Sequence, residues 1–248
     1  MLPTVQLGPL TLQAPGLILL LAVWIGLSRA EKVSHHAGIS ADRFYNLALV
    51  MLTAGLIGAR LGYAARNIDA FLASPASLLA LSPQMLSATD GIIIAFAAGI
   101  GYTQKAKIPV LHALDALAPA LAILMVGSHL ANFASGAAFG APTRLFWGIQ
   151  LWGETRHPVQ LLEALAAALI AFGIWPRAGS AAALPPGLRF VIFLGATALA
   201  RLWLELLRGD GGLVFGGLRQ AQVTAWVVLA LAAAAGARLL NPGQKPGK

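Results

Sequence analysis

Arg201, Glu205 and Arg208 lie four and three residues apart in ARLWLELLRGD, so they share one face of a predicted helix. Two guanidinium groups on one face could hold a phosphate, because the planar arginine fork binds phosphate oxygens bidentately. Glu205 would then orient one of the arginines. The same spacing also allows a purely structural role, in which Glu205 forms an internal ion pair that neutralises Arg201.

Glu163 and Arg60 are charged residues inside apolar segments, where an ionised side chain needs a partner. Glu163 belongs to RHPVQLLE, and its candidate partners are Arg60, Arg156 and Arg201. Arg60 belongs to GARLGY, whose small residues let a ligand or another backbone approach closely. The alternative for GARLGY is a helix-packing face with an arginine that extends to the membrane interface.

Two histidines close to these charges, His129 and His157, have the side chain whose ordinary pKa suits a base near neutral pH. His157 could instead make a backbone contact at the start of a helix, since Pro158 follows it at a position typical of a first turn. Asp90 and Asp115 are expected to cap a helix or to pair locally.

The composition indicates an integral membrane protein, because 58% of the 248 residues are hydrophobic and only 10% are charged. Without cysteine, the protein has no disulfide and no cysteine nucleophile, so thiol chemistry would use a partner's thiol. The net charge of +8 fits anionic lipid headgroups. Nucleic acid is not an expected partner, since the sequence contains no basic run or base-stacking module.

Seven segments are apolar and long enough to cross a bilayer, which takes roughly 20 residues per helix. We predict an all-α integral membrane fold, a seven-transmembrane helix bundle that forms a single polytopic domain over residues 1–248. The first segment is read as a retained helix rather than a cleaved signal peptide, and residues 241–248 as a flexible tail. The predicted spans are 14–30, 44–64, 88–104, 112–130, 157–176, 187–208 and 219–240.

Lysine and arginine counts in the loops predict the orientation, because cytoplasmic loops carry the excess. An outside N-terminus puts ten of these residues in the inner loops and tail and five in the outer loops. The bundle is therefore predicted to be N-out and C-in. Residues 66–87, broken by prolines, would form an interfacial segment on the outer face, and residues 131–156 an outer-face loop.

The order of several motifs resembles the bacterial prolipoprotein diacylglyceryl transferase family over most of the chain. These motifs are LGPLTL, GARLGY, LDALAPALAILMVGSHLANF, GAPTRLFWGI, RHPVQLLE and ARLWLELLR. The resemblance implies transfer of the diacylglyceryl group of phosphatidylglycerol to the lipobox cysteine thiol of a secreted prolipoprotein. It also implies a short N-terminal strand and a site that faces the outer leaflet of a bacterial plasma (inner) membrane.

Some family positions carry other residues in this chain. The family stretch reads like GRLGNFINGE and continues to a glycine and a Pro-Thr pair, which Asn132 and Gly140 help to match. His129 replaces its arginine and Ala137 its glutamate. A His-Gly-Gly stretch of the family is Thr89-Asp90-Gly91 here, and an aromatic pair is Ala14-Pro15.

Displacement of a phosphate by a thiol requires a base and a cationic donor for the departing group. We predict His129 and Arg201 for these catalytic roles, with no metal and no cofactor. The expected substrate-binding residues are Arg60, Asn132, Gly140, His157, Glu163, Glu205 and Arg208. Five of the nine residues are expected to converge on one cavity open to the outer leaflet: Arg60, His129, Asn132, Glu163 and Arg201.

The expected partners are phosphatidylglycerol or another anionic phospholipid, and a prolipoprotein signal peptide with a lipobox cysteine. Two alternatives stay open. One is a catalytically degraded paralogue that still binds phospholipid or a secreted peptide. The other is a transporter or channel, although the sequence has no paired broken helices or nucleotide motif.

Overall fold

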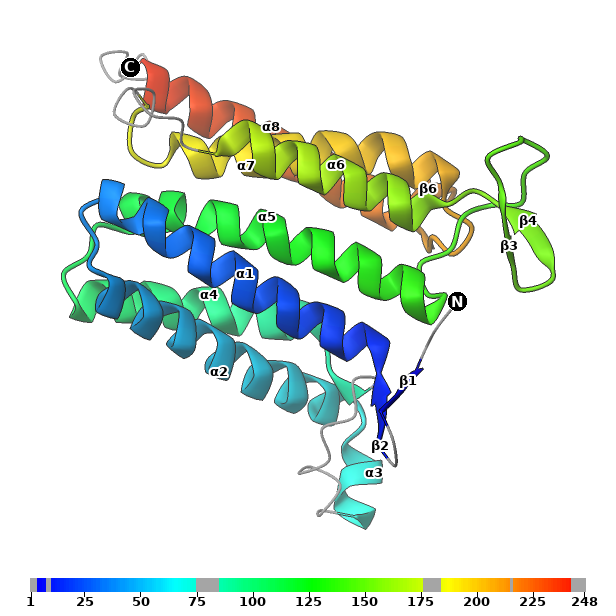
Figure 1. The fold of residues 1–248 in the computed structure, drawn as a ribbon. Helices are drawn as coiled ribbons and strands as arrows, with labels where there is room; N and C mark the ends of the chain where they lie inside the picture. The colour runs from blue at the N-terminus through cyan, green and yellow to red at the C-terminus, as the bar shows by residue number, and fades with distance from the viewer. Residues whose placement is uncertain (1–3, 8–9, 75–84, 176–183, 215, 242–248) are drawn as a thin grey trace. The chain divides into compact units, whose positions relative to one another are not determined.

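A computed structural model describes residues 4–7, 10–74, 85–175, 184–214 and 216–241 (Figure 1). The helices are α1 (Ala14–His36), α2 (Ala41–Arg66), α3 (Ile68–Ala73), α4 (Ala88–Lys105), α5 (Val110–Ser135), α6 (Val159–Ile174), α7 (Leu188–Leu204) and α8 (Gln220–Leu240). A 3-10 turn, Glu205–Leu207, follows α7. The strands are β1 (Thr4–Leu7), β2 (Leu10–Gln13), β3 (Ile149–Leu151), β4 (Glu154–Arg156), β5 (Leu213–Val214) and β6 (Leu218–Arg219).

All seven segments predicted to span the membrane are helical over most of their length. Four helices among the described residues are long and apolar enough to cross a bilayer: α2, α5, α7 with its 3-10 turn, and α8. Helix α6 is apolar but has 16 residues. Length and composition thus support a helical membrane protein, whereas the number of spans and their orientation stay predictions.

Three details of the sequence prediction need correction. Helix α5 continues to Ser135, so the first residues of the predicted loop 131–156 are helical. The all-α assignment omitted three two-stranded antiparallel hairpins, β1–β2, β3–β4 and β5–β6. The one strand expected, at LGPLTL, overlaps the end of β1 and most of β2. The helix predicted to end at residue 208 stops at Leu204 and tightens into the 3-10 turn. Residues 75–84 of the expected interfacial segment and 242–248 of the expected tail lie outside the described residues.

The contacts of the chain divide it into two compact units, residues 37–113 and a second unit of residues 1–36 and 114–248. In the first unit, small residues bring α2 and α4 together. A β-carbon on Gly58 would lie 2.6 Å from that of Ile94, and one on Gly62 would overlap the carboxylate of Asp90. The small residues of GARLGY therefore serve the packing of α4, as the structural alternative predicted.

Arg60 and Arg66 fasten the end of α2 to the chain around the start of α4. Arg60 is buried, donates to the Met85 carbonyl oxygen at 2.9 Å and lies 5.2 Å from the centre of the Phe71 ring. Arg66 pairs with both oxygens of Asp90, at 2.7 and 2.9 Å. Asp90 thus forms the local ion pair that the sequence suggested.

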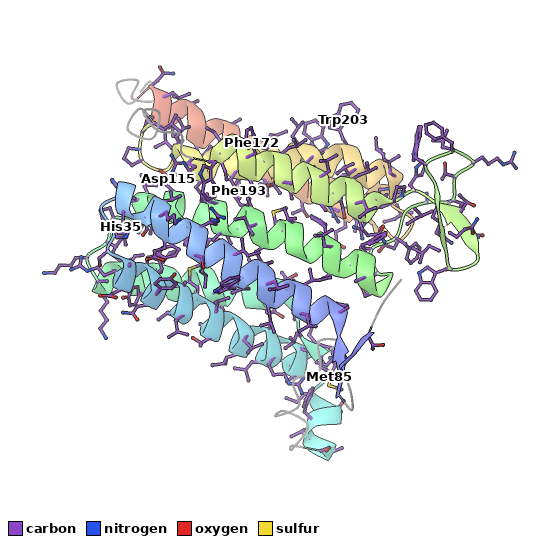
Figure 2. The ribbon with its side chains drawn as sticks, viewed as in Figure 1. His35, Met85, Asp115, Phe172, Phe193 and Trp203 are labelled. Carbon is purple, nitrogen blue, oxygen red and sulfur yellow. The ribbon has the colours of Figure 1, made fainter. Side chains whose placement is uncertain are left out.

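In the second unit, close approaches between helices again depend on small residues. A β-carbon on Gly26 of α1 would lie 3.1 Å from the Ala120 carbonyl oxygen of α5, and one on Gly127 would overlap Ala22. Apolar side chains from α5, α6 and α7 form a core around Phe193, which is labelled in Figure 2. The central residues of this core are Ala118, Ala122, Ile174 and Phe193.

Asp115 of α5 caps the start of α7 rather than its own helix (Figure 2). Its carboxylate accepts the backbone N–H groups of Gly187 at 2.7 Å and of Phe190 at 2.9 Å. Amide groups at a helix start have no partner within the helix, so this contact satisfies two of them across 72 and 75 residues of chain. Asp115 therefore fixes α7, which carries Arg201, against α5, which carries His129.

Candidate active site

Glu163 is the residue at which Arg201, Arg208 and His129 meet in the second unit. Its side chain is 4% exposed, and its two oxygens face different partners. Oε1 accepts from Arg201 at 2.9 Å and from Arg208 at 3.2 Å. Oε2 lies 3.0 Å from Nδ1 of His129, without the alignment of a hydrogen bond. The sequence left the partner of Glu163 open, and the structure pairs it with Arg201, Arg208 and His129.

Glu205 is a second buried carboxylate, 1% exposed, on the other side of Arg201. Its Oε2 lies 3.1 Å from Nη2 of Arg201 and 3.8 Å from Nε of Arg208. Arg219 approaches Oε1 to 3.8 Å and donates to the Arg208 carbonyl oxygen at 3.0 Å. The internal ion pair that the sequence allowed is therefore formed, and it holds Arg201 between two carboxylates.

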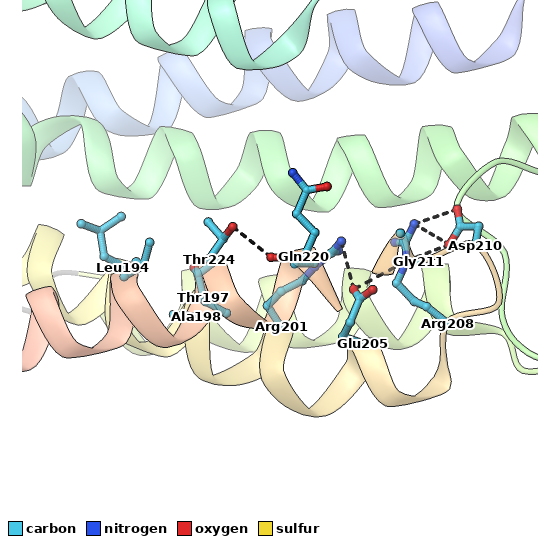
Figure 3. A pocket seen from close by; sticks show the side chains of 14 residues that line it. Leu194, Thr197, Ala198, Arg201, Glu205, Arg208, Asp210, Gly211, Gln220 and Thr224 are labelled. Atoms are coloured by element: carbon cyan, nitrogen blue, oxygen red, sulfur yellow. Dashed lines mark hydrogen bonds and ion pairs between the residues drawn. The ribbon is translucent and has the colours of Figure 1, made fainter. Parts of the chain in front are cut away.

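Arg208 uses its remaining donors on Asp210, two residues further along the chain. Nε donates to Oδ1 and Nη2 to Oδ2, each at 2.9 Å, which is a bidentate pair (Figure 3). A phosphate would use the same fork geometry. The cluster defined by Arg201, Arg208, Arg219, Glu163, Glu205 and Asp210 contains three cations and three anions, so it has no formal excess of positive charge.

Two cavities flank Arg201. The larger, about 580 Å³, lies between α7 and α8 and is lined by Glu205, Arg208 and Asp210 as well as by apolar side chains (Figure 3). The smaller, about 70 Å³, is lined by residues of α5, α6 and α7 and includes His129 and Glu163. Because Arg201 lines both cavities, one guanidinium group can contact groups bound on either side of α7.

Gly140 lies where the chain after α5 crosses the segment that carries Arg208. The two segments are joined by Ala141 N–H to the Leu207 carbonyl oxygen at 2.8 Å and by Gly209 N–H to the Phe139 carbonyl oxygen at 3.0 Å. A β-carbon on Gly140 would overlap the backbone carbonyl of His157. Gly140 is thus required by close packing beside Arg208, where its role is to position the backbone.

His157 packs against Gly140, and the place of Asn132 in the site stays a prediction. The backbone N–H of His157 donates to the Ala141 carbonyl oxygen at 3.0 Å, which leaves both roles considered for its side chain as predictions. Asn132 lies three residues after His129, on the same side of α5. Arg60 belongs to the other compact unit, and its place in a shared site stays a prediction.

The sequence analysis missed Asp210 and Arg219 as parts of this region. Gln160 is fully buried and donates to the Ala137 carbonyl oxygen at 2.9 Å. The bidentate pair of Arg208 with Asp210 had a usable signal, since an aspartate two residues from an arginine in RGD can reach it. Arg219 had no such signal, because only the β5–β6 hairpin returns it to Glu205.

Comparisons with known proteins identify the family of the chain. A sequence model described as prolipoprotein diacylglyceryl transferase matches residues 3–237. A phosphatidylglycerol–prolipoprotein diacylglyceryl transferase of Synechococcus elongatus is 30% identical over 240 residues, which cover 91% of this chain and 83% of that protein. One from a Nostoc species is 28% identical over 242 residues, covering 92% and 85%. The chain therefore belongs to the prolipoprotein diacylglyceryl transferase family.

Proposed function

We propose that this chain transfers the diacylglyceryl group of phosphatidylglycerol to the lipobox cysteine thiol of a prolipoprotein. The observation that carries the proposal is the position of Arg201, which lines two cavities and is held by Glu163 and Glu205. The names of the relatives give the donor and the acceptor class. Membership of the family supports the same reaction here.

In the proposed reaction, the acceptor thiol loses its proton and the thiolate attacks the glyceryl carbon bonded to the phosphate oxygen. A carbon–sulfur bond forms, the carbon–oxygen bond breaks, and glycerol phosphate leaves with the bonding electrons. Guanidinium groups stabilise this developing charge most where water is excluded. Arg201 is the residue proposed for that role, and Arg208 donates to the same oxygen of Glu163.

His129 is the proposed base for the thiol. It lines the smaller cavity beside Arg201, and Glu163 lies at its Nδ1. A carboxylate at one ring nitrogen orients an imidazole and stabilises the cation that forms when the other nitrogen accepts a proton. Glu163 therefore serves both the proposed base and the proposed phosphate ligands, as a positioning residue.

Asp210 occupies the fork of Arg208 that a lipid phosphate would need. Its side chain is 27% exposed, so it lies at the margin of the cluster, whereas Glu163 and Glu205 are almost completely buried. Three glycines, Gly209, Gly211 and Gly212, surround it in the sequence. We propose that the lipid phosphate displaces the Asp210 carboxylate and restores a net positive charge around the ligand.

The proposed setting is a bacterial inner membrane, with seven spans, an outside N-terminus and a site that faces the outer leaflet. The distribution of lysine and arginine supports this orientation. Arg60 and Asn132 are proposed to contribute to the same site, because both lie in motifs that match the family.

A second candidate is a paralogue that binds phospholipid or a secreted peptide without transfer. The observation in its favour is that His129 stands where the family has arginine and contacts Glu163 as a structural ion pair would. The formal charge balance of the cluster also fits a structural role. The two candidates differ in whether a thioether forms.

The orientation can be tested directly, because the chain has no cysteine of its own. Ser135→Cys lies at the end of α5 and Lys105→Cys at the end of α4. In intact spheroplasts, we expect a membrane-impermeant maleimide to label Ser135→Cys and to leave Lys105→Cys unlabelled until the membrane is opened. Labelling of Lys105→Cys alone in the intact state would contradict the N-out, C-in arrangement.

The transfer itself can be tested with purified protein, labelled phosphatidylglycerol and a lipobox peptide. We expect a diacylglyceryl thioether on the peptide cysteine, and we expect His129→Ala to lower the rate about 100-fold or more, as for a general base. His35→Ala, a change at an exposed histidine, is the matched control. Absence of product with the unaltered chain, together with retained lipid binding, would favour the binding paralogue. A rate unchanged by His129→Ala would exclude His129 as the base.

If a lipid phosphate displaces the Asp210 carboxylate, a variant without this carboxylate should bind anionic lipid more tightly. Asp210→Asn removes the competing charge, so anionic vesicles or short-chain phosphatidylglycerol should bind more tightly, by several-fold. Arg208→Gln should weaken the same binding. Asp69→Asn, a change at an exposed aspartate of α3, is the control for surface charge. Weaker lipid binding in Asp210→Asn would show that Asp210 supports the ligand site rather than occupying it.

A further inference from the structure

The β3–β4 hairpin and the loop before it carry large aromatic side chains that the protein leaves uncovered. Phe146 is 94% exposed, Trp147 47% and Trp152 67%. Phe146 and Trp147 pack edge to face, with ring centres 4.8 Å apart, just before β3. Trp152 lies in the turn between β3 and β4, at the other end of the hairpin. Aromatic surface is therefore exposed at both ends of the hairpin, beyond the ends of α5 and α6 (Figure 1).

The backbone conformation at Trp152 is unfavourable for a residue with a large side chain. Trp152 has φ 56° and Gly153 φ 81°, so both turn residues are in the left-handed region. Two-residue hairpin turns of this kind favour Asn-Gly, and a bulky residue there costs on the order of 1–3 kcal/mol. Nε1 of Trp152 donates to the Gly136 carbonyl oxygen at 3.1 Å. The indole N–H is therefore hydrogen-bonded, while the residue remains 67% exposed.

The hairpin is also tied to the segment that carries Arg208. Thr143 N–H donates to the Thr155 carbonyl oxygen at 2.8 Å, and Nη1 of Arg156 donates to the Gly140 carbonyl oxygen at 3.2 Å. Gly140 in turn pairs with Arg208 through an isolated β-bridge. A surface that holds the hairpin would therefore also fix the backbone beside the cluster.

We propose that residues 144–153 dock on the headgroup–acyl boundary of an anionic bilayer, at the end of the helices where the hairpin lies. Tryptophan and other aromatic rings favour this boundary, because the ring is apolar and the indole N–H stays hydrogen-bonded. Exposed Arg144 lies two residues before Phe146 and supplies a cation for lipid phosphates. The inference stands on the hairpin alone and does not require transfer activity.

A single-cysteine probe tests this docking. Phe146→Cys, labelled with an environment-sensitive fluorophore, is compared with Glu154→Cys, an exposed polar position of β4 in the same hairpin. In nanodiscs that contain phosphatidylglycerol, we expect blue-shifted emission at residue 146. Lipids spin-labelled near the headgroup should quench this probe several-fold more than the probe at residue 154. Arg144→Gln should reduce that quenching in anionic nanodiscs and leave it unchanged in neutral ones.

Two results would overturn the proposal. One is a residue 146 probe that aqueous iodide quenches freely and lipid quenchers do not affect. The other is a blue shift that appears only when a lipobox peptide is added, which would assign the surface to the peptide. Neither result bears on thioether formation, so a failure here is distinguishable from a failure of the proposed transfer.

Discussion

The carboxylate of Glu163 is the interaction on which the site depends. A buried ionised carboxylate costs several kcal/mol unless charged and hydrogen-bonding partners compensate it. Here Arg201 and Arg208 share one oxygen and His129 lies at the other. Arg201 belongs to α7, Arg208 follows the 3-10 turn after α7, and His129 belongs to α5. One side chain of α6 therefore contacts three other segments of the chain.

The same constraint explains why the supporting backbone is tight. Asp115 of α5 holds the start of α7, far along these helices from His129 and Arg201. At the other end, the chain around Gly140 is hydrogen-bonded to the segment of Arg208 and leaves no room for a side chain at residue 140. Fixed at both ends, α7 presents Arg201 to two cavities, and such preorganisation is what the role proposed for Arg201 would require.

Hydropathy was sufficient to predict seven of the helices, because it is a local property of the sequence. Helical spacing predicted the pairing of Arg201 with Glu205, although α7 ends at Leu204 and Arg208 follows a 3-10 turn. The choice of Arg201 rather than Arg156 as a partner of Glu163 was not predictable, since it depends on how α6 and α7 cross. The β3–β4 hairpin was missed because its strands have three residues and its turn is Trp-Gly rather than Asn-Gly. Arg219 was missed because a hairpin far from Glu205 in sequence returns it to the cluster.

The central claim, that Glu163 and Arg201 form a coupled pair that organises the site, is tested most directly by a double-mutant cycle. The free energy of unfolding in detergent is measured for the unaltered chain, Glu163→Gln, Arg201→Gln and the double variant. Residues in direct contact show coupling of about 0.5–3 kcal/mol, and for a buried ion pair we expect the upper half of that range. The second substitution should then lower the free energy of unfolding much less when the first substitution is already present. Additive effects, with coupling close to zero, would contradict the account.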